Sequence, residues 1–171
     1  MSEAGVGGER MSLCAIRAGD GLYGIDTREV REVLGATAPE RVPLAPKFVA
    51  GVVPYRGQVL TTVSLRALLG LESGSAGRCV LVLEDEEKGE RFGLLVDGVG
   101  GVLTLDAEGL AANPSGLDAR GTALFDGAFQ MDEGLVVRLD PRRLRPSRLA
   151  ESEMFAGGGR RGERHEGVDR R

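Results

Sequence analysis

Hydrophobic residues recur in short runs along the central part of the chain, and Gly, Asp or Pro separates one run from the next. Runs of this length that are rich in Val and Leu and bounded by turn residues predict β-strands. The near-continuous apolar character of Val80–Leu83 predicts a strand that is buried on both faces. The expected strands are Leu13–Arg17, Leu22–Ile25, Val49–Val53, Val59–Val63, Cys79–Leu83, Arg91–Val96, Leu124–Met131 and Leu135–Leu139.

One segment carries the signals of a helix start instead. Asp26 can cap the first free amides of a helix, and Glu29 can reach back toward that cap. The apolar residues that follow are spaced as on the buried face of a helix, and Gly35 can end it. We therefore expect a helix before Gly35 whose buried stripe is formed by Val30, Val33 and Leu34.

Two further short helices are expected. Ser64 is a good N-cap for a helix over Leu65–Leu69, and Pro141 after Asp140 suits the first position of another helix. The remaining pattern is about nine or ten short strands whose connections are too short for crossover helices. It favours closed or nearly closed small β-barrels over an open parallel sheet.

The composition changes at both ends of the chain. Residues 1–10 lack hydrophobic periodicity, and the chain from about Ala156 is rich in Gly and Arg, so both ends are expected to be disordered. The folded unit is expected to span residues 11–150 as two barrel subdomains, followed by a flexible tail over 151–171. The loop Leu71–Gly77 is the candidate joint between the subdomains.

The charge of the chain argues against a broad phosphate-binding face. The net charge is -4, although residues 157–171 carry five arginines against three acidic residues. A small-barrel protein that binds nucleic acid through this tail is one alternative, but no aromatic residue follows Phe155 to stack on bases. No segment resembles a secretion signal or a membrane span, so we expect a cytoplasmic protein without membrane insertion.

No set of residues suggests catalysis. The only histidine, His165, lies in the expected tail, and Cys14 and Cys79 sit in separate strand-like runs without a histidine partner. The glycine-rich segment Asp97–Gly101 lacks the pattern of a phosphate-binding loop. The adjacent carboxylates of Glu84–Glu87 are typical of a solvated turn. We expect no enzyme activity, catalytic residue, metal, cofactor or small-molecule substrate.

The turn between Val49–Val53 and Val59–Val63 presents Arg56 beside the apolar pair Pro54-Tyr55. A guanidinium held on a hairpin can bind a carboxylate or backbone carbonyls in forked geometry, which suggests an interaction edge. A simple soluble turn residue is the alternative.

Four segments occur in a specific order along the chain. They are Leu22–Asp26 with Val30–Val33, Val42–Gly57, Phe92–Val99 with Val102-Leu103, and Leu135–Pro141 with Leu144. Each is unspecific alone, but the ordered set resembles the CheW family, the adaptors of bacterial chemotaxis arrays. The resemblance covers about residues 11–150.

The resemblance implies a mainly β fold of two interlocked five-stranded SH3-like barrels with a few short helices. It implies a non-enzymatic adaptor that couples the regulatory domain of a CheA-type histidine kinase to the cytoplasmic tip of methyl-accepting chemoreceptors. The family's invariant arginine falls on Arg56 and its acidic position on Glu32, while Val99 lies near the groove where receptor helices are expected to dock. The implied protein-binding residues are Val30, Glu32, Tyr55, Arg56, Gly57 and Val99.

The chain departs from the family pattern at a few positions. Pro54-Tyr55 replaces Asn-Leu, and because Pro lacks a backbone donor, hydrogen bonding at this strand end must differ. Ser64 replaces an acidic residue, but both types cap helices well. Gly100-Gly101 replaces a more polar pair at the expected groove rim.

Overall fold

The computed structural model describes residues 8–72, 74, 78–85, 87, 89–113, 115 and 117–156. Within this part of the chain, ten strands form two five-stranded sheets, called sheet A and sheet B. The expected fold class, mainly β with two five-stranded barrels, is confirmed. The expectations for residues 1–7, for the Arg-rich segment 157–171 and for His165 lie outside the described residues.

Sheet A has the order β8-β1-β2-β10-β9 and sheet B the order β3-β6-β7-β5-β4. The strands of sheet A are β1 (Arg10–Ala18), β2 (Gly21–Asp26), β8 (Gly98–Asp106), β9 (Phe125–Met131) and β10 (Gly134–Leu139). The strands of sheet B are β3 (Val30–Gly35), β4 (Val49–Tyr55), β5 (Gln58–Ser64), β6 (Cys79–Glu84) and β7 (Arg91–Val96). The short helices are η2 (Thr27–Glu29), α1 (Leu65–Leu69), η3 (Ala107–Gly109), α2 (Ala119–Leu124), α3 (Pro141–Leu144), α4 (Pro146–Glu151) and α5 (Glu153–Ala156).

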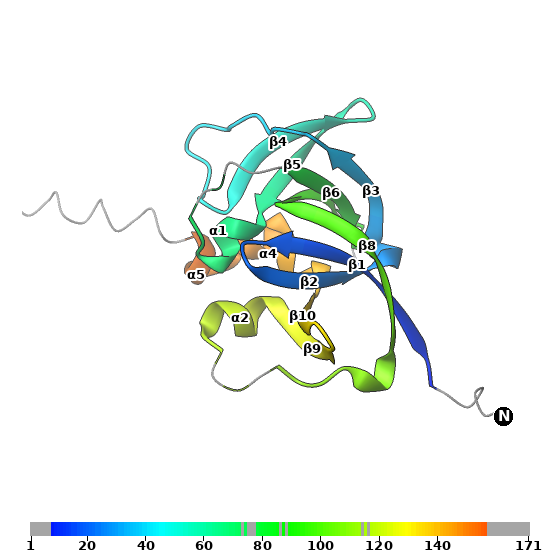
Figure 1. The fold of residues 1–171 in the computed structure, drawn as a ribbon. Helices are drawn as coiled ribbons and strands as arrows, with labels where there is room; N and C mark the ends of the chain where they lie inside the picture. The colour runs from blue at the N-terminus through cyan, green and yellow to red at the C-terminus, as the bar shows by residue number, and fades with distance from the viewer. Residues whose placement is uncertain are drawn as a thin grey trace, which may run out of the picture.

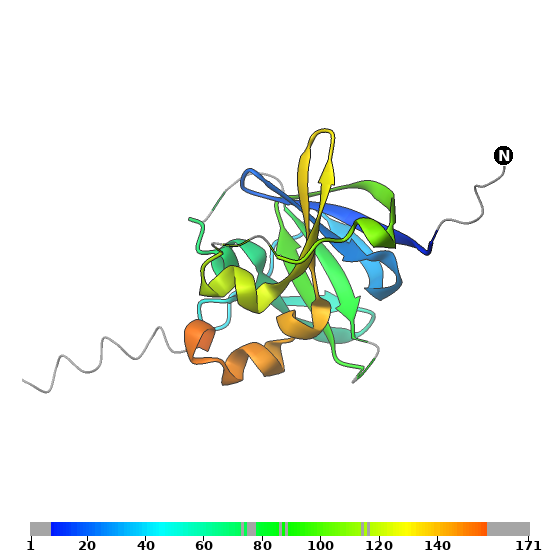
Figure 2. The ribbon, with the colours of Figure 1, turned by 90° about the horizontal axis from the view of Figure 1, so that it is seen from below.

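The chain interlocks the two sheets, because it builds two strands of sheet A, then all of sheet B, and then returns to sheet A (Figure 1). The sheets share one pairing pattern. In each, antiparallel strands flank a single parallel pair, which is β2 with β10 in sheet A and β5 with β7 in sheet B. Figure 2 shows the β9–β10 hairpin (yellow) projecting from the body and the C-terminal helices (orange) lying to one side.

Among the residues that the structure describes, buried side chains form three clusters. One lies in each sheet's own barrel, and a larger third cluster joins residues of both sheets. Strand β6 shows how they are divided: Val80 and Val82 belong to the cluster of sheet B, whereas Leu81 and Leu83 belong to the shared cluster. Alternating side chains of one strand therefore enter two cores, which confirms the predicted burial of Val80–Leu83 on both faces.

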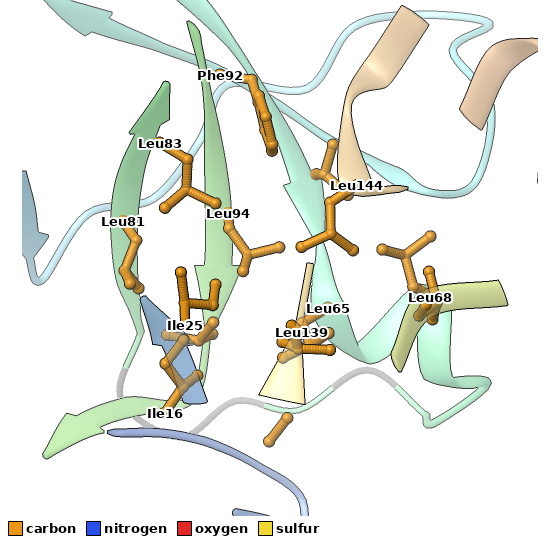
Figure 3. Packing of buried hydrophobic residues seen from close by; sticks show 14 of the residues in the cluster. Ile16, Ile25, Leu65, Leu68, Leu81, Leu83, Phe92, Leu94, Leu139 and Leu144 are labelled. Carbon is orange, nitrogen blue, oxygen red and sulfur yellow. The ribbon is translucent and has the colours of Figure 1, made fainter. Parts of the chain in front are cut away.

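The shared cluster holds the two barrels together. In Figure 3, Ile16, Ile25 and Leu139 come from sheet A and face residues of sheet B and the short helices. The labelled residues on that side are Leu65, Leu68, Leu81, Leu83, Phe92, Leu94 and Leu144. Because this apolar surface belongs to both barrels, neither barrel can be removed without exposing the face of the other.

The predicted helix after Asp26 is wrong. Asp26 does cap a turn, since its Oδ1 accepts a hydrogen bond from the Arg28 amide at 2.9 Å, but only the 3-10 turn η2 follows. The chain then forms β3, which pairs with β6. Alternation along a strand turns Val30 and Leu34 inward and leaves Val33 42% exposed. The β-branched valines and the open edge of β6 outweigh the helical spacing.

The joint between the barrels also differs from its prediction. Both strands that flank Leu71–Gly77 belong to sheet B, and several residues of that loop lie outside the described part. The chain instead passes between the sheets around Thr27–Glu29 and at Asp97. The predicted domain boundary at residue 150 falls within α4.

Candidate functional site

The β4–β5 hairpin has a two-residue turn that presents Arg56. Tyr55 pairs with Gln58, and the two residues between them have φ values of 50° at Arg56 and 77° at Gly57. Two positive φ values in succession are typical of a type I′ turn, which matches the twist of the flanking strands. The Arg56 side chain is 70% exposed on this turn.

Arg56 pairs with the other residue that the family resemblance singled out. Its Nη2 donates to Oε1 of Glu32 at 3.1 Å. Glu32 lies on β3 and Arg56 follows β4, and these strands are the two ends of the sheet B order. The ion pair therefore joins opposite edges of the sheet, as the closure of a barrel requires.

The Tyr55 ring packs against the guanidinium of Arg56. The ring is only 8% exposed and packs with Val53 and Leu60 in the cluster of sheet B. Arg56 Cζ lies 5.3 Å from the ring centroid, a cation–π distance. The pKa of the Arg56 guanidinium is raised, first by its hydrogen bond to Tyr55 and then by the Glu32 carboxylate.

A second ion-paired group borders the same ring. Arg91 Cζ lies 6.0 Å from the Tyr55 centroid, and Arg91 and Arg31 both contact Glu84, at 3.0 and 2.9 Å. The hydrogen bond from Arg91 is the largest of the effects that lower the pKa of the Glu84 carboxyl. We call this set the arginine–tyrosine cluster: Arg31, Glu32, Tyr55, Arg56, Glu84 and Arg91.

Sequence reasoning found half of the arginine–tyrosine cluster. Arg31, Glu84 and Arg91 were missed because they lie at the ends of three different strands, and a charge at a strand end carries no signal of its own. The one clue in the sequence is the opposite charges of Glu84 and Arg91, which lie opposite each other where β6 pairs with β7.

The departure at Pro54-Tyr55 is accommodated locally. Pro54 is exposed on β4, which is an edge strand of sheet B, so its missing N–H breaks no interior ladder. Tyr55 brings an aromatic face where the family has Leu, and this face carries the cation–π contact with Arg56.

The other site residues from the sequence lie in different places. Gly57 is exposed beside Arg56, and Val30 is partly buried against the shared cluster. Val99 is also partly buried against that cluster, but it lies on β8 of sheet A, opposite Ile16 on β1. The structure thus brings Glu32, Tyr55, Arg56 and Gly57 together and places Val99 on the other sheet.

Asp97 fixes the crossing from sheet B to sheet A. Its carboxylate accepts two strong hydrogen bonds from Arg66, at 2.9 and 3.0 Å, and one from the Gly19 amide at 2.8 Å. Arg66 is the main cause of the lowered pKa of this carboxyl. Because Gly98 already begins β8, the glycine-rich segment is a strand and provides no phosphate-binding loop.

Asp85, the residue directly after β6, is structural as well. The sequence suggested a solvated turn, but Asp85 is fully buried and accepts a hydrogen bond from Arg145 at 2.7 Å. Among the residues that the structure describes, no three His, Cys, Asp or Glu side chains are placed to hold a metal ion. Within the same residues, no helix is long and apolar enough to cross a membrane.

These features define a class of protein: two β-barrels with a shared core, whose distinctive surface is an ion-paired arginine on a stiff turn. The family model of the CheW-like domain matches residues 12–148, so the chain belongs to the CheW family.

Relatives and a solved structure agree with this membership. The chain is 33% identical over 102 residues to the chemotaxis protein CheW of Rhizobium meliloti (strain 1021), covering 60% of this chain. That match spans 66% of the relative, just under two thirds of its length. A chemotaxis protein CheW of Klebsiella aerogenes is 28% identical over 136 residues, 80% of each chain. The crystal structure of the scaffolding protein TtCheW from Thermoanaerobacter tengcongensis has the same fold, with a TM-score of 0.69 at 22% identity over 77% of this chain and 90% of that chain.

Proposed function

We propose that the chain is a non-enzymatic adaptor in a chemotaxis-like signalling pathway. In this role it couples methyl-accepting chemoreceptors to the regulatory domain of a CheA-type histidine kinase in the cytoplasm. Family membership and relatives named as chemotaxis proteins support the pathway. The observation that carries the proposal is the exposed Arg56 held in place by Glu32 and the Tyr55 ring.

The geometry of Arg56 suits protein recognition. Glu32 engages Nη2 and Tyr55 accepts another hydrogen bond, so the remaining guanidinium N–H groups are left for a carboxylate or for backbone carbonyls of a partner. The turn, the ion pair and the aromatic support restrict the side chain before binding, which lowers the entropy lost on association. The same atoms offer no nucleophile or general base.

We assign the receptor tip to this end of sheet B and to the surface around Val99 on β8. A receptor helix would bury its apolar stripe against partly exposed apolar residues of both barrels, among them Val30 and Val99. Arg56 would then orient the helix by binding polar groups at its edge.

Titration of the purified full chain with a receptor-tip fragment and, separately, with a kinase regulatory domain tests the proposal. We expect both to bind with a Kd of about tens of micromolar or tighter. Arg56→Glu should weaken receptor binding by about tenfold or more, because it repels Glu32 and reverses the presented charge. Arg10→Glu is the matched control, since Arg10 is also exposed and ion-paired, with Asp106 on β8. Absence of binding to either fragment at roughly 100 micromolar would overturn the proposed coupling.

A further inference from the structure

A hollow of about 330 Å³ lies at the end of the parallel pair β5 and β7 in sheet B. Its walls include Ser64 and Leu95, which pair where these two strands end. Among the residues that the structure describes, four cations and one carboxylate line the hollow: Arg41, Lys47, Arg66, Arg78 and Asp97. The chain has a net charge of -4, so the charge of this hollow is opposite in sign to that of the whole protein.

Two of the five charged groups already satisfy each other. Arg66 donates through Nε and Nη2 to the Asp97 carboxylate, at 2.9 and 3.0 Å. Its Nη1 donates to a backbone carbonyl, that of residue 72, at 2.6 Å, so this pair forms a fixed wall without net charge. Within the described part of the chain, Arg41, Lys47 and Arg78 form no ion pair. These three side chains, which we call the three open cations, supply the charge that a ligand would meet.

The backbone holds the three open cations at fixed places. Glu40, next to Arg41, exchanges two backbone hydrogen bonds with β4, at 2.8 and 2.9 Å. Phe48, next to Lys47, is 3% exposed, and its carbonyl accepts a hydrogen bond from the last residue of β5 at 2.8 Å. Arg78 directly precedes β6, and its Nη2 donates to the carbonyl four residues earlier at 2.8 Å. Segments far apart in the sequence thus bring their cations to one hollow.

Folding alone does not account for this arrangement. Like charges around one hollow repel one another, and salt screens them only partly, because the Debye length is about 8 Å at physiological ionic strength. The three open cations therefore lower the stability of the fold when nothing is bound. An anion in the hollow would replace this repulsion with charge-assisted hydrogen bonds.

We propose that this hollow binds a small soluble phosphate, either free or as a monoester. A phosphate group accepts hydrogen bonds on several sides, which suits three cations from separate segments better than the two oxygens of a carboxylate do. Its charge of about -1.5 to -2 at neutral pH is opposite to theirs. The volume is near the lower limit for small-molecule sites, and Val49, Ala50 and Leu71 add an apolar wall for the organic part of an ester.

Titration calorimetry of the full chain with inorganic phosphate and with glycerol 3-phosphate, at constant ionic strength, tests the site. We expect saturable binding of at least one of them, and the double variant Arg41→Gln with Lys47→Gln should weaken it by about tenfold or more. Arg78→Gln should weaken it as well. Arg10→Gln changes an exposed arginine of sheet A and is the matched control, with unchanged affinity. Without phosphate, the double variant should melt at the same temperature as the unmodified chain or higher, because repulsion is removed.

Three outcomes would overturn the phosphate site. The first is no saturable binding of either ligand at roughly 10 millimolar. The second is equal affinity in the unmodified chain and the double variant, which would place the phosphate elsewhere. The third is binding to phosphatidic acid vesicles, but not to phosphatidylcholine vesicles or the soluble phosphates, which would assign the hollow to a lipid headgroup. None of these results changes the receptor and kinase titrations, so the proposed function is tested separately.

Discussion

Asp85 and Arg145 form the most deeply buried ion pair in the part of the chain that the structure describes. Their oxygen and nitrogen are 2.7 Å apart, and the two side chains are 1% and 10% exposed. Asp85 follows β6 of sheet B, whereas Arg145 lies between α3 and α4, after the last strand of sheet A. The pair therefore ties the C-terminal helices to the other barrel, and the hydrogen bond from Ser147 to Glu90 at 2.6 Å adds a second tie.

Loss of Arg145 should leave the buried Asp85 carboxylate without its main countercharge. We expect Arg145→Met to lower the free energy of unfolding by about 3–5 kcal/mol, measured by urea denaturation. Asp85→Asn combined with Arg145→Met should be less destabilised than Arg145→Met alone, because asparagine is neutral and can still accept the hydrogen bond from the Glu87 amide. Equal losses in the single and double variants would contradict a buried-charge penalty.

The free energy of unfolding should depend on pH through Asp97, which lies where the chain passes from sheet B to sheet A. Its pKa is lowered in the folded chain, so its contribution is present above the pKa of the unfolded state, about 4, and is lost as the pH falls through the folded pKa. The difference in unfolding free energy between the unmodified chain and Asp97→Asn should therefore be larger at about pH 7 than at about pH 3. A difference that stays constant with pH would show that the carboxylate charge is unimportant there.

Gly57 should contribute to folding stability through its backbone conformation alone. A Cβ at this position meets no atom within 4 Å, but the φ of 77° is unfavourable for alanine. We expect Gly57→Ala to cost about 1 kcal/mol in thermal or urea unfolding. Gly101→Ala is the control, because Gly101 has equally open space without a positive φ. If both substitutions had the same effect, the turn conformation would not be the cause.

Tyr55 should stabilise the fold through its ring rather than through the hydroxyl that hydrogen-bonds Arg56. Tyr55→Ala removes a buried ring from the cluster of sheet B and should lower the unfolding free energy by about 3 kcal/mol or more. Tyr55→Phe keeps the ring beneath Arg56 and should retain both the fold and most of the receptor affinity. Thermal unfolding and receptor titration of the two variants check this. A Phe variant as unstable as the Ala variant would assign the effect to the hydroxyl instead.

Local signals predicted those parts of the fold that depend on neighbouring residues. Ser64 caps α1 through a hydrogen bond from the Ala67 amide, and Gly70 ends this helix with a φ of 76°. The hairpin turn at Arg56-Gly57 is also where the sequence placed it. The capping and turn preferences of these residues act within a few positions, so the sequence is enough.

Strands that depend on distant partners were predicted less well. Strand β8 is rich in glycine and was not expected, yet it forms through its long antiparallel pairing with β1. The spacing of apolar residues in β3 predicts a helix, but the segment is a strand because it pairs with β6. In both cases a strand far away in the sequence supplies the hydrogen bonds that override local propensity.

The sequence by itself determined the turns, the caps, the buried β6 and, through the order of its motifs, the family. It also indicated Glu32 and Arg56 as two separate candidate protein-binding residues. Only the tertiary structure decided that these two side chains meet, because their contact requires sheet B to close until its edge strands lie side by side. That closure depends on the packing of two cores at once, which no local segment encodes.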